Sequence, residues 1–148
     1  MATVKQIIEA KGKRPTLSVE ASASVLEALE VMAEADIGAV MVKEGERIIG
    51  IFTERDYARK CELQGLTAAE TPLQEMMTSE MVTVKSDISA DDCMGIMDQH
   101  HIRHLPVVDG GSMVGIVSLR DMVGTMLEDR ETTIKGLENY ILTSEFPT

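Results

Sequence analysis

Apolar residues occur along the chain in one pattern that appears twice. In residues 16–57 a short apolar run precedes a helical pattern, two further apolar runs follow, and a second helix begins near Thr53. Residues 81–122 repeat this order at a constant offset of 65 without a gap, and ten of the 42 aligned pairs are identical. A period this long is typical of a duplicated small domain and not of a solenoid. The pattern predicts two β-α-β-β-α repeats.

The first helix of each repeat has a clear start and a clear buried face. Ser24 and Ser89 stand where a side chain can cap a helix, and Ser24 is followed three residues later by Glu27, as in a capping box. Apolar residues then recur at helical spacing. The residues expected on the buried faces are Val25, Leu29, Met32 and Ala33 in the first repeat, and Ala90, Cys93, Met94 and Met97 in the second.

The two apolar runs after each helix predict a hairpin. Their turns contain Gly45 and the pair Asp109-Gly110, and Asp-Gly between apolar runs favours a tight β-turn. Pro106 has no backbone N–H, so we expect it at a sheet edge or near the beginning of its strand.

The repeat boundaries predict the domain organisation. We expect a first repeat with a leading helix in residues 1–62, a linker in 63–75, a second repeat in 76–128, and a helical tail in 129–148. Residues 3–12 predict the leading helix. Residues 130–142 predict a trailing helix with Ile134, Leu137 and Ile141 on one face. The fold class is α/β in the broad sense (α+β).

Composition excludes several classes of function. The net charge of −11 disfavours binding to nucleic acid and to anionic membranes, because the whole-chain field repels both. No stretch reaches the length of a membrane span, and the N-terminal residues do not resemble a signal peptide. Two cysteines, far apart, predict no disulfide framework, which favours a reducing, cytoplasmic location.

The order of elements, together with two motifs, resembles the cystathionine-β-synthase (CBS) domain family. The motifs are residues 102–109 and 115–121 in the second repeat, matched by 37–39 and 50–60 in the first. The resemblance implies two repeats related by a pseudo-twofold axis in one disc-like module, and a homodimer of such modules. It also implies clefts between the repeats that hold AMP, ADP, ATP, NAD or S-adenosylmethionine, with AMP favoured. Such modules sense cellular energy or a metabolite and regulate a partner protein, which this sequence does not identify.

The resemblance also implies roles for residues where each second helix begins. The hydroxyl groups of Thr53 and Ser118 would contact ribose or phosphate, and the carboxylates of Asp56 and Asp121 would accept hydrogen bonds from ribose hydroxyls. A helix N-terminus attracts phosphate through its unpaired N–H groups. The alternative is that Thr-x-x-Asp and Ser-x-x-Asp are capping boxes satisfied within the helix.

Further candidates surround these positions. Arg103 and His104 would face phosphate, with Ile102 and Pro106 against the base. Because the first repeat has Gly38 and Ala39 instead of Arg103 and His104, we expect the second repeat to bind phosphate better. The remaining candidates are Thr16, Ile37, Arg55, Thr83, Arg120, Lys13 and Arg14.

Alternatives remain at several of these positions. Arg55 and Arg120 could instead pair with an acidic neighbour, and Lys13-Arg14 could be a solvated basic turn. A metal site formed by the histidines at 100, 101 and 104 does not fit the usual ligand spacings. We therefore expect no metal.

Two other classes of function compete with nucleotide binding. The chain could be a protein-interaction or dimerisation module without a ligand. An enzyme is not expected, because the sequence contains no catalytic triad, metal motif or Walker loop.

Overall fold

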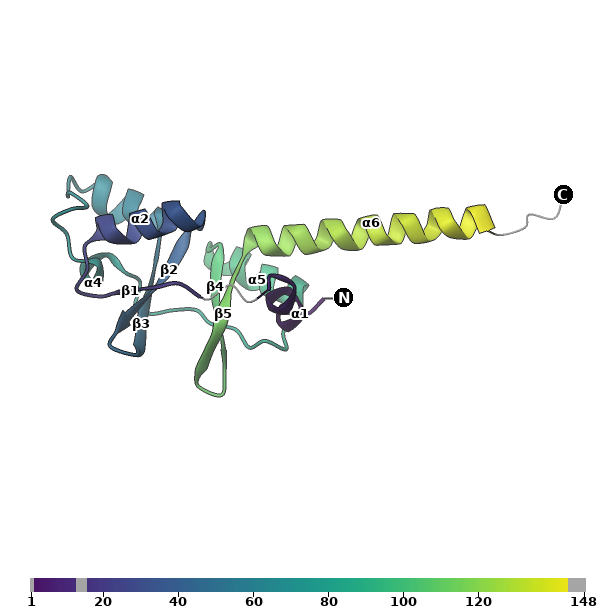
Figure 1. Ribbon diagram of the computed structural model, residues 1–148, viewed down its shortest axis with the longest axis horizontal. Coiled ribbons are helices and arrows are strands. Elements are labelled where there is room, and N and C mark those ends of the chain that lie inside the picture. The colour runs from purple at the N-terminus through teal and green to yellow at the C-terminus, as the bar shows by residue number, and fades with distance from the viewer. Residues whose placement is uncertain (1, 13–15, 144–148) are drawn as a thin grey trace. The chain divides into compact units, whose positions relative to one another are not determined.

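A computed structural model of the chain describes residues 2–12 and 16–143, with side chains as far as residue 139. Contacts between residues divide it into two compact units, Arg14–Thr83 and the combination of Met1–Lys13 with Val84–Thr148. Each unit contains one repeat, and we describe each by itself (Figure 1).

The unit of the first repeat has a three-stranded sheet in the order β1-β2-β3. Strand β1 is parallel to β2, and β2 is antiparallel to β3. The elements of this unit are β1 (Ser18–Glu20), α2 (Val25–Ala35), β2 (Ala39–Glu44), β3 (Arg47–Thr53), α3 (Glu54–Asp56), the π-helix η1 (Tyr57–Glu62) and α4 (Leu73–Met76).

The unit of the second repeat has the antiparallel pair β4-β5 at its centre. Its elements are α1 (Val4–Ala10), α5 (Ala90–His100), β4 (His104–Asp109), β5 (Ser112–Ser118) and α6 (Leu119–Thr143).

The two repeats match element by element, which confirms the duplication predicted from the sequence. The bounds of α2, β2 and β3, shifted by 65 residues, are those of α5, β4 and β5. Each first helix ends on a left-handed residue at the same position, Asp36 (φ 54°) or His101 (φ 55°). In both hairpins two residues form the turn, and Gly110 and Gly111 supply the positive φ angles that a tight β-turn requires. The predicted mixture of helices and strands is confirmed as well.

Pro106 explains why the second repeat has no full counterpart of strand β1. In the first repeat the N–H of Met41 donates to the carbonyl of Leu17, which helps to hold β1 against β2. Pro106 occupies the position that corresponds to Met41 and has no N–H to donate. The strand that corresponds to β1 is therefore reduced to a single parallel bridge between Val84 and Val107.

Helix α1 packs against the second repeat, and α4 packs against the first. Thr3, which caps α1, forms a bridge with Ser89, and the N–H of Val4 donates to the carbonyl of Ile88. In the same way Pro72, before α4, forms a bridge with Ser24 in the first repeat. The domain boundaries predicted from the sequence placed residues 3–12 with the first repeat, whereas by contacts α1 belongs to the unit of the second repeat.

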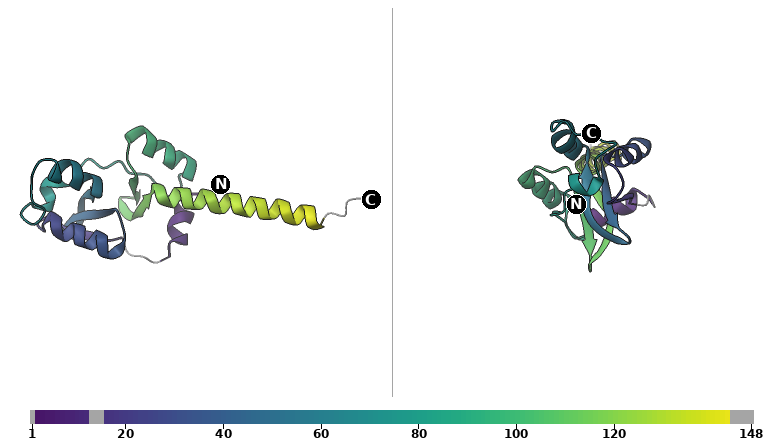
Figure 2. Two further views of the ribbon diagram at one scale, coloured as in Figure 1. Left: turned by 90° about the horizontal axis from the view of Figure 1, so that it is seen from above. Right: turned by 90° about the vertical axis from the view of Figure 1, so that its left-hand side faces the viewer.

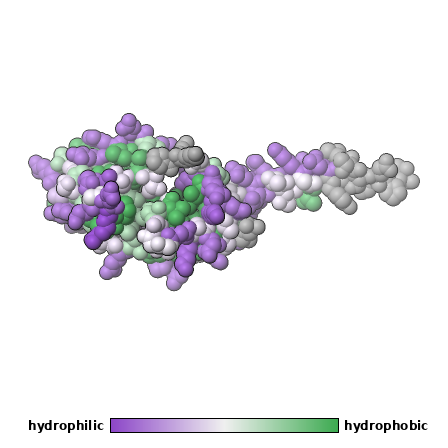
Figure 3. Space-filling model, turned by 60° about the horizontal axis from the view of Figure 1, so that its bottom comes forward, coloured by the Kyte–Doolittle hydropathy of each residue, from purple (hydrophilic) through white to green (hydrophobic). Residues whose placement is uncertain are grey.

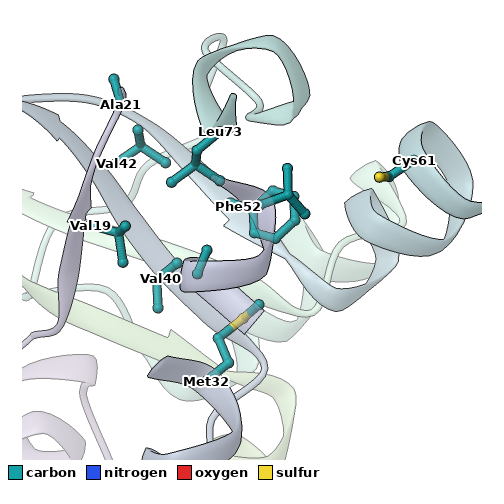
Figure 4. Packing of buried hydrophobic residues seen from close by; sticks show 10 residues of the cluster. Val19, Ala21, Met32, Val40, Val42, Phe52, Cys61 and Leu73 are labelled. Atoms are coloured by element: carbon teal, nitrogen blue, oxygen red, sulfur yellow. The ribbon is translucent and has the colours of Figure 1, made fainter. Parts of the chain in front are cut away.

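Aliphatic side chains and one aromatic residue, Phe52, fill the core of the first repeat's unit. Val25 and Met32 on α2 pack with Val40 of β2, Phe52 of β3 and Leu73 of α4 (Figure 4). The predicted buried faces are largely confirmed: Val25 and Met32 of α2, and Ala90, Cys93 and Met97 of α5, are buried. The prediction for Ala33 is wrong, because Ala33 is exposed and Ala28, one turn before the buried Met32, is in the core instead.

The second helix of the second repeat and the predicted trailing helix form one continuous helix, α6, of 25 residues. Its first turns contact α5, β5 and α1, and its later turns extend beyond these elements (Figure 2). No helix in the described part of the chain has both the length and the apolar composition required to cross a bilayer.

Candidate functional site

The beginning of α6 is held by two reciprocal hydrogen bonds. The N–H of Ser118 donates to Oδ2 of Asp121 (2.8 Å), and the N–H of Asp121 donates to Oγ of Ser118 (3.2 Å). This is a capping box in which an aspartate takes the third position. It places a hydroxyl and a carboxylate beside the N–H groups of the first helical turn, where a negative ligand is favoured.

Lys11, just after α1, neutralises this carboxylate. Its Nζ lies 2.8 Å from Oδ2 of Asp121 and 3.2 Å from the carbonyl oxygen of Ile116 in β5. The position of Lys11 follows from the packing of α1 against the second repeat, since the lysine lies 110 residues away from Asp121 in sequence. The carboxylate therefore belongs to an ion pair as well as to the helix cap.

Arg103 and His104 lie against the same helix N-terminus. The carbonyl of Arg103 accepts the N–H of Leu119, and His104 pairs with Ser118 in the β4-β5 ladder. Burial lowers the pKa of His104, and the positive charges of Lys11 and Arg103 lower it further, whereas Asp121 acts in the opposite direction. The His104 imidazole is therefore biased toward its neutral form in a cluster that already holds two cations.

The first repeat builds the same capping box from different surroundings. Thr53 and Asp56 exchange hydrogen bonds of 3.1 Å in both directions. Oδ1 of Asp56 also lies 3.1 Å from Nζ of Lys60, and the hydroxyl of Thr78 donates to Oδ1 and Oδ2 at 3.3 and 3.4 Å. Thr78 is held there by two backbone hydrogen bonds with Ile51 of β3.

The carboxylates of Asp56 and Asp121 consequently differ in whether one oxygen lacks a hydrogen-bond partner. Both oxygens of Asp56 accept hydrogen bonds within their own unit. Within the part of the chain that the structure describes, both hydrogen bonds that the Asp121 side chain accepts go to Oδ2, and Oδ1 has no partner. The side chain of Asp121 is 18% exposed, and the described residues include no buried side-chain oxygen without a partner, so Oδ1 is accessible to a further donor.

The remaining predicted site residues are distributed around these caps. Arg55, Arg120, Thr16 and Thr83 are exposed, Ile37 and Ile102 are half-buried, and Pro106 is fully buried in its own unit. Lys13 and Arg14 lie outside the described residues. The ligand contacts of all these residues stay predictions.

Three residues of the capping clusters were missed from the sequence. Lys60 lies one turn after Asp56, a spacing that could have been recognised as a helical ion pair. Lys11 and Thr78 have no comparable local signal, because each reaches its carboxylate only through the packing of a distant segment.

The histidines do not assemble a metal site. His100 ends α5 and His101 follows it, both exposed, while His104 is half-buried in β4. Among the described residues, no group of three or more His, Cys, Asp or Glu side chains is placed to hold a metal ion.

Comparison with known proteins agrees with the duplicated architecture. The family model described as "CBS domain" matches residues 4–62 and 73–128. The chain is 33% identical over 147 residues to the mitochondrial CBS domain-containing protein CBSX3 of Arabidopsis thaliana, covering 94% of this chain and 71% of that protein.

Solved structures share the fold. A putative signal-transduction protein with CBS domains from Burkholderia ambifaria superimposes with a TM-score of 0.83 at 42% identity, covering 86% of this chain and 96% of that one. The CBS domain pair of protein MJ0100 has a TM-score of 0.72 at 26% identity and covers 84% of this chain and 99% of that one. That pair was solved in complex with 5′-methylthioadenosine and S-adenosyl-L-methionine.

Proposed function

The chain belongs to the CBS-domain family, and from this premise we propose that it is a regulatory module that binds an adenosine-containing nucleotide at the N-terminus of α6. AMP is the ligand we favour, with ADP, ATP, NAD and S-adenosylmethionine as the other members of the class. The MJ0100 pair, which binds two adenosine compounds, supports this choice of class.

The observation that carries the proposal is that only one of the two carboxylate oxygens of Asp121 has a hydrogen-bond partner. A ribose has two adjacent hydroxyl groups that can donate to a carboxylate oxygen. Among the described residues, Oδ1 of Asp121 has no donor, while Lys11 forms an ion pair with Oδ2. The ribose would therefore bind without displacing the helix cap. Asp56 offers no such oxygen, because Thr53, Lys60 and Thr78 occupy both.

The charge around the second cap supports phosphate as the other half of the ligand. Lys11 forms an ion pair with Asp121, the positive charge of Arg103 acts on the neighbouring His104, and the N–H groups at the beginning of α6 lie beside the same carboxylate. His104 adds a group that can gain a proton when an anion approaches. This local positive charge would have to hold the phosphate against the net charge of −11 of the whole chain.

A thermal-shift panel tests the proposal. A ligand that binds only the folded protein at a hundredfold excess over its Kd stabilises it by about 2.7 kcal/mol. We expect at least one of AMP, ADP, ATP, NAD and S-adenosylmethionine to raise the melting temperature, and inorganic phosphate serves as the control for nonspecific anion binding. If none of the adenosine compounds acts, the proposal is wrong.

The same proposal assigns no catalysis to the chain and places it in a reducing compartment, where it regulates another protein and forms a homodimer. Both cysteines are free and buried, in keeping with such a compartment. The relative CBSX3 carries the description mitochondrial, so a mitochondrial location is an alternative to the cytoplasm. Steady conversion of a bound nucleotide by purified protein would contradict the regulatory assignment.

An interaction module without a ligand is the second candidate. The exposed apolar residues of α6 favour it, because they offer a surface for another chain. In that case no nucleotide would bind, and Asp121 would serve only as a helix cap.

A further inference from the structure

The exposed part of α6 carries a stripe of apolar side chains. Val123, Leu127, Ile134 and Leu137 are each between 45% and 59% exposed, which is high for large aliphatic residues on a helix. All residues from 127 to 139 are exposed. Hydrophobic residues are visible among hydrophilic and neutral ones along this part of the chain in Figure 3. Within the chain itself, the described residues leave this stripe uncovered.

The helix needs a partner to persist over this length. Residues 127–139 include Thr132, Thr133, Gly136 and Asn139, which are weak helix formers. Isolated helices shorter than about 12–15 residues are marginal in water even when they are rich in alanine. A segment of this composition gains most of its helical stability from packing of its apolar face. We therefore expect another helix or surface to cover the stripe when the protein is folded.

The spacing of the stripe is that of a coiled coil. The steps from Val123 to Leu127, Ile134 and Leu137 are 4, 7 and 3 residues, which places them at d, a, a and d of successive heptads. At 100° per residue they lie within an arc of about 80° on the helix. A narrow seam of this kind fits one facing helix, whereas a helix packed on a globular core has a wider apolar face.

One charge within the seam and one beside it fit a second copy of the same helix. Arg130 occupies the d position between Leu127 and Ile134, and Glu131 follows at e. In a parallel pair, a residue at d packs beside the e residue of the facing helix. Arg130 of each copy would then lie beside Glu131 of the other copy, which gives two ion pairs in the dimer. Among the described residues of its own chain, Arg130 forms no ion pair.

A membrane surface fits the apolar stripe less well than a second copy of the helix does. Helices that lie on membranes carry many Lys and Arg residues on their polar face. Residues 128–139 of α6 contain four acidic and two basic side chains, which an anionic surface would repel.

We propose that α6 forms a parallel two-stranded coiled coil with α6 of a second copy of this chain, through Val123, Leu127, Arg130, Ile134 and Leu137. The proposal specifies a surface for the homodimer proposed above and does not depend on nucleotide binding. Because the seam covers only about two heptads, we expect a dimer that dissociates in the micromolar range.

Sedimentation measurements from about 1 to 100 µM protein test this surface. We expect the wild-type chain to approach twice its monomer mass of 16.2 kDa as concentration rises. Leu137→Asp places an unpaired charge in the seam and should raise the dimer dissociation constant roughly a hundredfold or more. The matched control is Thr132→Asp, which adds the same charge at the f position of the same helix and should leave the constant unchanged.

A charge exchange tests the parallel register. Arg130→Glu should weaken the dimer, and the double variant Arg130→Glu with Glu131→Arg should recover it. If the double variant stays as weak as the single one, the parallel register is wrong.

The remaining outcomes separate this inference from the proposed function. If Leu137→Asp and the wild-type chain dimerise equally, the seam on α6 is not the interface, although self-association stands. If the wild-type chain stays monomeric at all concentrations, the coiled coil is overturned. In every case the nucleotide-induced shift of Leu137→Asp should equal that of the wild-type chain, because residue 137 lies 16 residues, about 24 Å, along the helix from Asp121.

Discussion

Asp121→Ala distinguishes a helix cap from a nucleotide ligand. The substitution removes the acceptor for the N–H of Ser118, and it leaves the ammonium group of Lys11 without its carboxylate. Loss of a capping side chain costs about 1 kcal/mol. The ion pair adds roughly 0.2–1 kcal/mol, because the side chain of Lys11 is 38% exposed and solvent weakens the attraction.

The expected loss of stability is therefore about 1–2 kcal/mol without any ligand. For a chain of 148 residues this corresponds to a decrease in melting temperature of roughly 3–6 °C. The matched control is Ser89→Ala, which removes the cap of α5 in the same unit, where Oγ of Ser89 accepts the N–H of Asp92 at 3.1 Å. Both variants should lose comparable stability in thermal or chemical unfolding.

Addition of AMP separates the two variants. Ser89→Ala should keep the nucleotide-induced rise in melting temperature, since its hydroxyl lies at a different helix. Asp121→Ala should lose most of that rise, because the ribose hydroxyls lose their acceptor. If AMP stabilises Asp121→Ala as much as it stabilises Ser89→Ala, the carboxylate is only a cap and the reasoning about its free oxygen is refuted.

Three further predictions concern the packing and the titration of the two units. Gly50→Ala would place a methyl group 2.7 Å from Sδ of Met77, so the segment after α4 should be displaced and the protein destabilised by about 1–3 kcal/mol, measured by urea unfolding. The pKa of His104 should lie below 6.5 in the folded chain. The contribution of the neutral imidazole to the free energy of unfolding should therefore be lost as the pH falls from 6.5 through that lowered pKa. A His104 pKa above 6.5, measured by NMR, would contradict this. Burial raises the pKa of Cys93 to about 11, so its thiol should react with a disulfide reagent at pH 8 only after unfolding, and rapid reaction of the native protein would show the packing of α5 to be wrong.

Local patterns in the sequence predicted most of each repeat. Ser24 and Ser89 cap their helices as expected, and the turn at Gly110 forms where Asp-Gly favours it. These features depend on residues close in sequence, so spacing and residue type suffice to predict them. The capping boxes of Thr53 and Ser118 were the alternative interpretation of their motifs, and they form for the same local reason.

Features that depend on distant segments could not be predicted in this way. The packing of α1 against the second repeat brings Lys11 to Asp121, and the pairing of Thr78 with Ile51 brings a hydroxyl to Asp56. Both contacts decide whether a carboxylate oxygen is free. The sequence contains the lysine and the threonine, but only the tertiary arrangement shows which carboxylate each one reaches.

A crystal structure of the chain with AMP would show whether Asp121 binds the ribose. We predict that the ribose hydroxyls lie within hydrogen-bond distance of Oδ1 of Asp121, with the phosphate near Lys11 and Arg103. A nucleotide that contacts only Thr16, Thr53 and Asp56, or crystals at saturating AMP with no nucleotide beside Asp121, would contradict the account.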